Sequence, residues 1–286
     1  MAATGGFIAV RDLQMYYERA GSGPRLLYIS GTGGDLRRKP SIFERPIAEH
    51  FEVLSFDQRG LGQTSKPETE YTMADYAADA VGLLDALGWD RCHVMGVSFG
   101  GMVAQEIAIR YPERVERLVL ACTSSGGAGG ASYPLHNHLD DTPKERVERQ
   151  LGLADIRKDA AWRAANADEY ATLVEQGLAG AALGADEPGR TDGYRRQLRA
   201  RQFLDTFERL PGVTAQTFIC GGRYDGIAPI SNQEALLSQL PNAQLELFEG
   251  GHGFLNEDPR AFERAIAFLN GELDSTKAGT KANAAG

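Results

Sequence analysis

The chain has 286 residues, of which 42% are hydrophobic, and a formal net charge of −9 at pH 7. This length exceeds one typical domain but suits a single α/β sheet that carries an insertion. The acidic balance argues against nucleic acid or an anionic membrane as the main partner, because either would require Lys and Arg clustered over a large face. No run of about 20 apolar residues occurs, and residues 1–6 lack the basic and hydrophobic regions of a secretion signal, so we expect a cytoplasmic protein.

Strands and helices alternate along most of the chain. Short apolar or alternating runs predict strands, and apolar residues spaced by three and four predict helices. The predicted strands are Phe7–Val10, Leu13–Tyr17, Leu26–Ile29, Val53–Phe56, Cys92–Val97, Val115–Cys122, Phe218–Gly221 and Leu245–Phe248, and the clearest helices are Met73–Leu87 and Phe262–Leu269. This alternation indicates an α/β fold with a mostly parallel sheet that helices cover on both faces.

The alternation is interrupted after Cys122 by a glycine-rich segment, and strand character returns only near Thr214. The residues between are rich in Ala, Arg and Glu and have periodic apolar positions, which favours several short helices. These positions include Val147, Leu151, Leu173, Val174 and Leu178. We expect residues 1–123 and 211–274 to form the core, residues 124–210 a helical insert, and residues 275–286, which show no periodicity, a disordered tail.

The most informative motif is Gly96-Val97-Ser98-Phe99-Gly100, which lies between a predicted strand and a helical pattern that begins at Met102. At a strand-to-helix turn of this kind the serine adopts a strained backbone conformation, and small residues two positions to either side let the strand and helix approach closely. The serine hydroxyl then stands exposed above the sheet. Ser98 is therefore the candidate nucleophile.

Candidate partners for Ser98 follow two later strands. Asp225 lies in the loop after Phe218–Gly221, and His252 lies in the loop after Leu245–Phe248. A serine hydroxyl is barely ionised at neutral pH and needs a base to take its proton, which an imidazole can do. Asp225 would hold the histidine in the required tautomer and stabilise the imidazolium.

This order of Ser, Asp and His, each at the carboxyl end of a different strand, resembles the α/β-hydrolase superfamily over nearly the whole chain. Further matching segments are Ser30–Gly34, Asp57–Gly62 and His252–Pro259. The resemblance implies that the helical insert is a cap over the active site. Because a cap shapes the pocket, substrate choice is expected to depend largely on residues 124–210.

The resemblance also implies an oxyanion hole made of backbone N–H groups. One comes from Phe99, at the positive end of a helix, and the other from Thr32, in the loop after an early strand. The chain departs from the commoner family pattern at Ser30, where histidine usually precedes the glycine. The donors are backbone groups, so they do not depend on that side chain.

These residues predict a serine hydrolase of a small-molecule ester or lactone that forms an acyl-Ser98 intermediate and uses no cofactor. Among serine members of the family, the chain looks most like small-ester and enol-lactone hydrolases, with Met102 and Gln105 continuing the helix after the motif as in enol-lactonases. Met102, Tyr224 and Phe254 adjoin the motif loops and are candidates for substrate binding. The sequence does not determine the oligomeric state.

Other activities on the same fold stay open. Haloalkane dehalogenases and epoxide hydrolases are disfavoured, because they carry a carboxylate where this chain has Ser98. Carbon–carbon bond hydrolases of ring-cleavage diketones commonly have tryptophan after the catalytic histidine, where this chain has Gly253. A serine-triad haloperoxidase or perhydrolase would use the same three residues, and a ligand receptor that hydrolyses slowly would also retain them.

No metal site is predicted. Three cysteines, an odd number without CxxC spacing, fall in or beside apolar runs and are expected to be buried free thiols; they are Cys92, Cys122 and Cys220. The remaining histidines are scattered without carboxylates at ligand spacing; they are His50, His93, His136 and His138. The basic run Arg37–Lys39 is read as solvated surface, with steering of an acidic substrate as the alternative.

Overall fold

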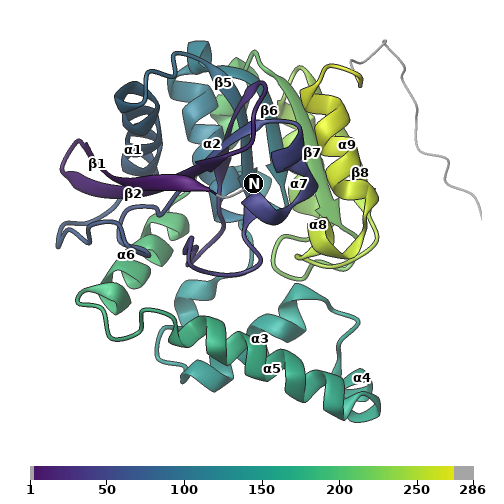
Figure 1. Cartoon of the computed structure of the whole chain (residues 1–286). Helices are drawn as coiled ribbons and strands as arrows, with labels where there is room; N and C mark the ends of the chain where they lie inside the picture. Colours follow the sequence, from purple (N-terminus) through teal and green to yellow (C-terminus); the bar gives the residue numbers. More distant parts are fainter. Residues whose placement is uncertain (1–2, 274–286) are drawn as a thin grey trace, which may run out of the picture.

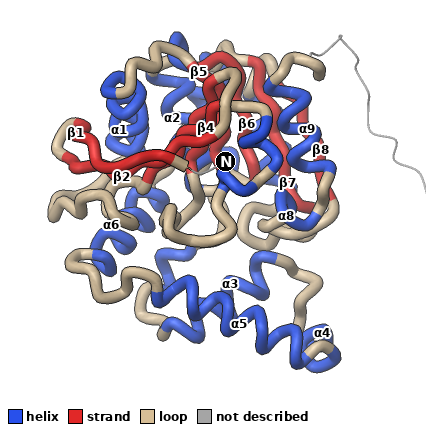
Figure 2. The backbone as a smooth tube through the Cα atoms, in the orientation of Figure 1, coloured by secondary structure: helices blue, strands red, loops and turns tan. Residues whose placement is uncertain are grey.

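Eight strands form one sheet in the computed structural model, which describes residues 3–273 of the chain (Figures 1 and 2). The strands are β1 (Thr4–Val10), β2 (Leu13–Ala20), β3 (Arg25–Ile29), β4 (Glu52–Phe56), β5 (Cys92–Val97), β6 (Val115–Ala121), β7 (Gln216–Gly222) and β8 (Ala243–Phe248). Their order is β1-β2-β4-β3-β5-β6-β7-β8. β2 pairs antiparallel with β1 and β4, and the other pairs are parallel. The predicted mostly parallel α/β sheet is confirmed.

Some strand ends differ from the sequence prediction, and pairing explains the differences. β1 starts at Thr4 because Gly5 and Gly6 pair with β2, although glycine has a low strand preference. β2 continues to Ala20 because its last residues pair with β4. β6 ends at Ala121, one residue early, because Cys122 has a φ of 41°, which is incompatible with a strand.

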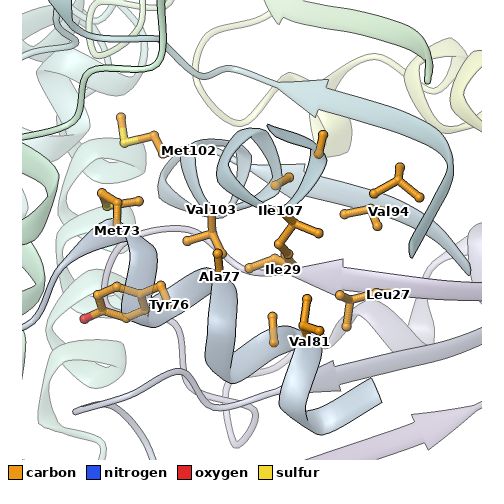
Figure 3. Packing of buried hydrophobic residues seen from close by; sticks show 14 of the residues in the cluster. Leu27, Ile29, Met73, Tyr76, Ala77, Val81, Val94, Met102, Val103 and Ile107 are labelled. Carbon is orange, nitrogen blue, oxygen red and sulfur yellow. The ribbon is translucent and has the colours of Figure 1, made fainter. Parts of the chain in front are cut away.

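Helices cover both faces of the sheet, as the two-sided burial of its strands requires. The helices of the core are α1 (Met73–Ala86), α2 (Phe99–Arg110), α7 (Ile230–Gln239), α8 (Phe254–Glu257) and α9 (Arg260–Leu269). One hydrophobic cluster joins α1, α2 and α7 to strand residues such as Leu27 and Val94, and Figure 3 shows α1 and α2 packed against them. A second cluster joins α8 and α9 to the alternate strand residues, including Leu26 and Met95.

Four helices lie between β6 and β7 in the described chain, where the sequence predicts a helical insert. They are α3 (Pro143–Ala154), α4 (Ala160–Ala165), α5 (Ala167–Ala182) and α6 (Arg190–Gln202). Figure 1 shows α3, α4 and α5 as a layer below the core, with α6 between that layer and the sheet. The role of this insert as a cap and its bounds at 124–210 remain predictions, and the predicted tail 275–286 lies outside the described residues.

Helix starts in the insert follow ordinary capping chemistry. Thr142 accepts a hydrogen bond from the backbone N–H of Glu145, whose carboxylate accepts from the Thr142 N–H in return, which starts α3. Asp159 accepts from the Trp162 N–H and starts α4. Within residues 3–273, no helix combines the length and the apolar character that crossing a bilayer would need.

Candidate active site

Ser98 lies at a sharp turn between β5 and α2. Its φ of 56° and ψ of −117° place it among the few non-glycine residues with positive φ in the described chain, a conformation that costs of order 1–3 kcal/mol. The flanking glycines make the turn sterically possible. A Cβ at Gly96 would lie 2.3 Å from the Gly100 carbonyl oxygen, and a Cβ at Gly100 would lie 2.0 Å from the Ile29 carbonyl oxygen.

Backbone hydrogen bonds hold the strained serine in place. The Ser98 N–H donates to the Ala121 carbonyl at 2.8 Å, and the Ser98 carbonyl accepts from Thr123 Oγ1 at 2.8 Å. Ala121 is the last residue of β6, the neighbouring strand, and Thr123 follows it by two residues. The surrounding structure therefore over-determines the conformation of Ser98, as strained functional residues require.

Ser98, His252 and Asp225 form a continuous chain of hydrogen bonds. His252 Nε2 lies 2.9 Å from Ser98 Oγ, and His252 Nδ1 lies 2.7 Å from Asp225 Oδ2. The Asp225 side chain is buried, and its other oxygen accepts from the backbone N–H groups of Ile227 and Ala228 at 2.8 and 2.9 Å. These bonds fix the carboxylate so that one oxygen faces the imidazole.

The insert contacts the loops that carry Asp225 and His252. The last residues of α3 accept two backbone hydrogen bonds, from Gly226 to Leu153 and from His252 to Ala154. The fit at this point is close, because a Cβ at Gly251 would lie 1.8 Å from the Ala154 carbonyl oxygen. The carboxyl end of α3 therefore supports the histidine loop directly.

The loop after β3 reaches Ser98 from the other side. A Cβ at Gly31 would lie 3.3 Å from Ser98 Cβ, so the backbone that leads to Thr32 passes beside the serine. The Gly33 N–H donates to Gln197 Oε1 on α6 at 2.9 Å. The Phe99 N–H opens α2 and, as the first N–H of a helix, has no acceptor within it. The part of Thr32 and Phe99 in an oxyanion hole remains a prediction.

Asp57 ties this loop to the core. Its carboxylate accepts from the Leu36 N–H and from the Gln63 N–H, each at 2.8 Å. Burial raises the pKa of Asp57 to about 6. The Asp57–Gly62 segment matches the family pattern in sequence, but that match does not predict this contact.

Three side chains of kinds that can bind a metal ion lie close together at the site. Ligand atoms of Cys122, Asp225 and His252 lie within 4.8 Å of one another. Burial, together with the charge of Asp225, raises the pKa of the Cys122 thiol well above its ordinary value. Cys92, Cys122 and Cys220 are buried and free, as predicted.

The three predicted substrate-binding residues have different surroundings. Met102 is buried in the cluster of α1 and α2 (Figure 3), and Phe254 is buried in the opposite cluster, stacked on Phe248 with ring centroids 5.5 Å apart. Tyr224 is partly exposed, and the Arg157 guanidinium lies 4.0 Å from its ring centre. Substrate contact by these residues remains a prediction.

The basic run Arg37–Lys39 is largely occupied by ion pairs. Arg37 pairs with Asp35 at 2.8 Å and with Glu187 of the insert, and Lys39 pairs with Glu44 at 2.9 Å. These contacts connect the loop after β3 to its surroundings and favour a structural role over substrate steering.

Comparisons with known proteins agree with this architecture. A family model described as alpha/beta hydrolase fold matches residues 24–259. A relative from Pseudomonas savastanoi pv. phaseolicola, named "Putative carbamate hydrolase RutD", is 32% identical over 87% of this chain and 95% of its own length. A poly(3-hydroxyalkanoate) depolymerase from Ectopseudomonas oleovorans is 30% identical over 80% of this chain and 78% of its own length. The solved enol-lactonase of Burkholderia xenovorans LB400 has a TM-score of 0.72 at 22% identity and covers 94% of this chain and 98% of its own.

The chain therefore belongs to the α/β-hydrolase fold family, as the sequence motifs implied. Hydrolysis is the class of function that this membership supports. The bond that is cleaved is a separate question, because members of one fold act on different substrates.

Two residues on α6 were not singled out by the sequence analysis. Gln197 holds the loop after β3, and Arg201 donates to Ser132 Oγ at 2.7 Å. Both partners are distant in sequence, with separations of 164 and 69 residues, so no local motif marks them. The only signal was their position in the insert, where the sequence analysis expects specificity.

Proposed function

We propose that this protein is a serine hydrolase that cleaves a carboxylic ester or lactone through an acyl-Ser98 intermediate. The observation that carries the proposal is the hydrogen-bond chain from Ser98 Oγ through His252 to Asp225, built on a serine with positive φ. A depolymerase of a polyester among the relatives agrees with ester chemistry.

The first half of the reaction forms the acyl-enzyme. Ser98 Oγ attacks the substrate carbonyl carbon while His252 Nε2 takes the serine proton. The negative charge on the carbonyl oxygen is stabilised by the backbone N–H groups of Thr32 and Phe99. The bond to the leaving oxygen then breaks, and His252 gives its proton to that oxygen.

The second half restores the enzyme. Water attacks the acyl carbon and His252 takes its proton, after which the bond to Ser98 Oγ breaks and the proton returns to that oxygen. Asp225 keeps Nδ1 of His252 protonated throughout, so that Nε2 is free to accept a proton. The carboxylic acid and the alcohol are the products, and a lactone gives both in one molecule.

A second candidate is hydrolysis of a carbamate. The relative named for this activity is 32% identical over most of both chains. Ser98 Oγ would attack the carbamate carbonyl with the same help from His252 and Asp225, the bond to the leaving oxygen would break as in an ester, and water would release the carbamoyl group from Ser98 as a carbamic acid. The two candidates differ in the substrates turned over and share the need for Ser98.

A fluorophosphonate probe, read by intact mass, tests whether Ser98 is activated. We expect one adduct on the full chain and on Ser238→Ala, a serine exposed on α7, and none on Ser98→Ala. A panel of p-nitrophenyl esters, lactones and carbamates then assigns the bond class. An unlabelled wild-type protein would contradict the proposal, and slow single turnover with retained product would favour a receptor.

A further inference from the structure

Helix α6 carries two buried polar side chains one turn apart, Gln197 and Arg201, with 0% and 6% of their surface exposed. Gln197 Nε2 and Arg201 Nε are buried without a hydrogen-bond partner. Residues four apart share one face of a helix. Buried polar groups are nearly always paired, so two unpaired donors on one face indicate a place for an acceptor that the protein itself does not supply.

Arg201 also lacks the counter-charge that a buried arginine normally has. Its Nη2 donates to the neutral Ser132 Oγ, and no carboxylate in residues 3–273 forms an ion pair with it. Arg59, exposed to a similar 3%, pairs with both Asp12 and Asp79 at 2.7 Å. Burial lowers the pKa of Arg201 to about 10, because removal from water disfavours the charged guanidinium.

One set of contacts connects Arg201 to the nucleophile. Ser132 Oγ accepts from Arg201 and from Ser124 Oγ, the latter at 3.2 Å. Ser124 follows Thr123, whose Oγ1 donates to the Ser98 carbonyl. The guanidinium is therefore held by the segment that leaves β6 beside Ser98.

Gln197 connects to the opposite side of Ser98. Its Oε1 accepts from the Gly33 N–H, in the loop that passes Ser98 at Gly31. The two unpaired donors of α6 thus belong to residues held by the loops on either side of the nucleophile. Figure 1 shows α6 between the sheet and the layer of α3 and α5, which agrees with this placement.

We propose that Arg201, with Gln197 beside it, binds a carboxylate of the substrate, so that the ester or lactone cleaved at Ser98 carries a free carboxylate elsewhere in the molecule. This inference rests on the proposed function and names the class of its substrate. A guanidinium presents a planar fork of donors that matches two carboxylate oxygens, and one cation balances one negative charge. Arg199 on the same helix is 62% exposed and pairs with Glu70 at 3.3 Å, so it does not offer such a site.

A matched pair of substrates separates this role from a structural one. The p-nitrophenyl monoester of adipic acid carries a free carboxylate, and its methyl ester is neutral. We expect wild-type protein to prefer the free acid, and Arg201→Gln to lower kcat/KM for it by roughly 10- to 100-fold while the neutral ester changes by less than about threefold. The control Arg199→Gln should leave both within about threefold.

Binding without turnover gives an independent readout. Dicarboxylates of four to eight carbons are added to Ser98→Ala protein, and the shift in Tm is measured. We expect at least one to raise Tm, and the rise to disappear in Ser98→Ala/Arg201→Gln. Stabilisation through Arg201 without any ester turnover would overturn the proposed function and leave the carboxylate site standing.

Three results would overturn the carboxylate site. They are equal loss of both substrates in Arg201→Gln, no preference of the wild type for the free acid, and no dicarboxylate that stabilises the protein. If Arg201→Gln does not fold, Arg201→Lys replaces it, because lysine keeps the charge but loses the fork. We then expect a smaller, still selective loss for the free acid, and an unselective effect would refute the site.

Discussion

The turn at Ser98 and the insert helices act on the same site by different means. The turn is held by close backbone contacts within the core, among them Gly100 against Ile29 and Ser98 against Ala121. The insert instead reaches the surrounding loops at a few separate points, such as Gln197 with Gly33 and the end of α3 with the loops of Asp225 and His252.

This difference separates two requirements of the site. The proposed nucleophile, Ser98, needs a strained conformation that does not relax, and a close-packed core supplies it at the end of the sheet. The loops around it must fit a particular substrate, and contacts from an insert can change without loss of the fold. If the proposed function holds, changes in the core turn and in the hydrogen-bond chain of Ser98, His252 and Asp225 should remove activity or stability, and changes in the insert should adjust rate and selectivity.

The largest effect on activity is expected for Asp225→Asn. The asparagine keeps an oxygen for the Ile227 and Ala228 N–H groups, so the fold should persist, but its amide favours the wrong tautomer of His252. We expect kcat for an activated ester to fall by about 10⁴-fold. Asp85→Asn, at a carboxylate that is 63% exposed, is the control and should keep wild-type turnover. Near-normal kcat in Asp225→Asn would assign the acid role to another carboxylate.

Two glycine substitutions test through stability whether the turn is packed more closely than the insert. In Gly100→Ala the new Cβ would meet the Ile29 carbonyl oxygen, so we expect a loss of about 3 kcal/mol or more. In Gly180→Ala, within α5 of the insert, the new Cβ would have no atom within 4 Å. Because alanine favours a helix, that variant should gain up to about 1 kcal/mol. Urea unfolding measures both, and equal effects would show that the turn is not closely packed.

The core and the three residues of the hydrogen-bond chain could be predicted because their signals are local. The apolar runs gave the strands, and Ser98 was marked by the glycines on either side of it. The positions of Ser98, Asp225 and His252 after the ends of three parallel strands, β5, β7 and β8, were enough to bring them to one edge, because parallel strands end on the same side of the sheet. Their hydrogen bonds agree with that expectation.

The surroundings of the site could not be predicted in the same way. Gln197 lies in a helix of mostly polar residues, and nothing nearby in sequence marks it as buried. Its partner is 164 residues away. The end of β6 could not be predicted either. The apolar run in the sequence continues through Cys122, but the folded chain gives this residue a φ of 41°, which ends the strand at Ala121.

A smaller effect, on the free energy of unfolding, is expected for Asp57→Asn, and this effect depends on pH. The pKa of Asp57 is raised from an unfolded value near 3.9 to about 6, so the folded state holds its proton while the unfolded state has lost it. The wild type therefore loses up to about 3 kcal/mol from this group as pH rises from about 4 to 6. Relative to wild type, Asp57→Asn should become more stable by that amount over this range. A difference in unfolding free energy that does not change with pH would show that Asp57 is not buried as described.

The smallest effect is expected where the insert contacts the core through one hydrogen bond. Gln197→Met keeps the length of the side chain but removes the acceptor for the Gly33 N–H, in the loop that carries Thr32. A buried donor left unpaired costs about 1–3 kcal/mol, and part of this cost should appear as a displaced oxyanion donor. We therefore expect kcat for a neutral ester to fall roughly tenfold with little change in KM.

The control is Gln202→Met, an exposed glutamine on the same helix, which should leave kcat unchanged. If kcat is unchanged and only KM rises in Gln197→Met, α6 binds the substrate without positioning the loop, and the insert acts on selectivity alone.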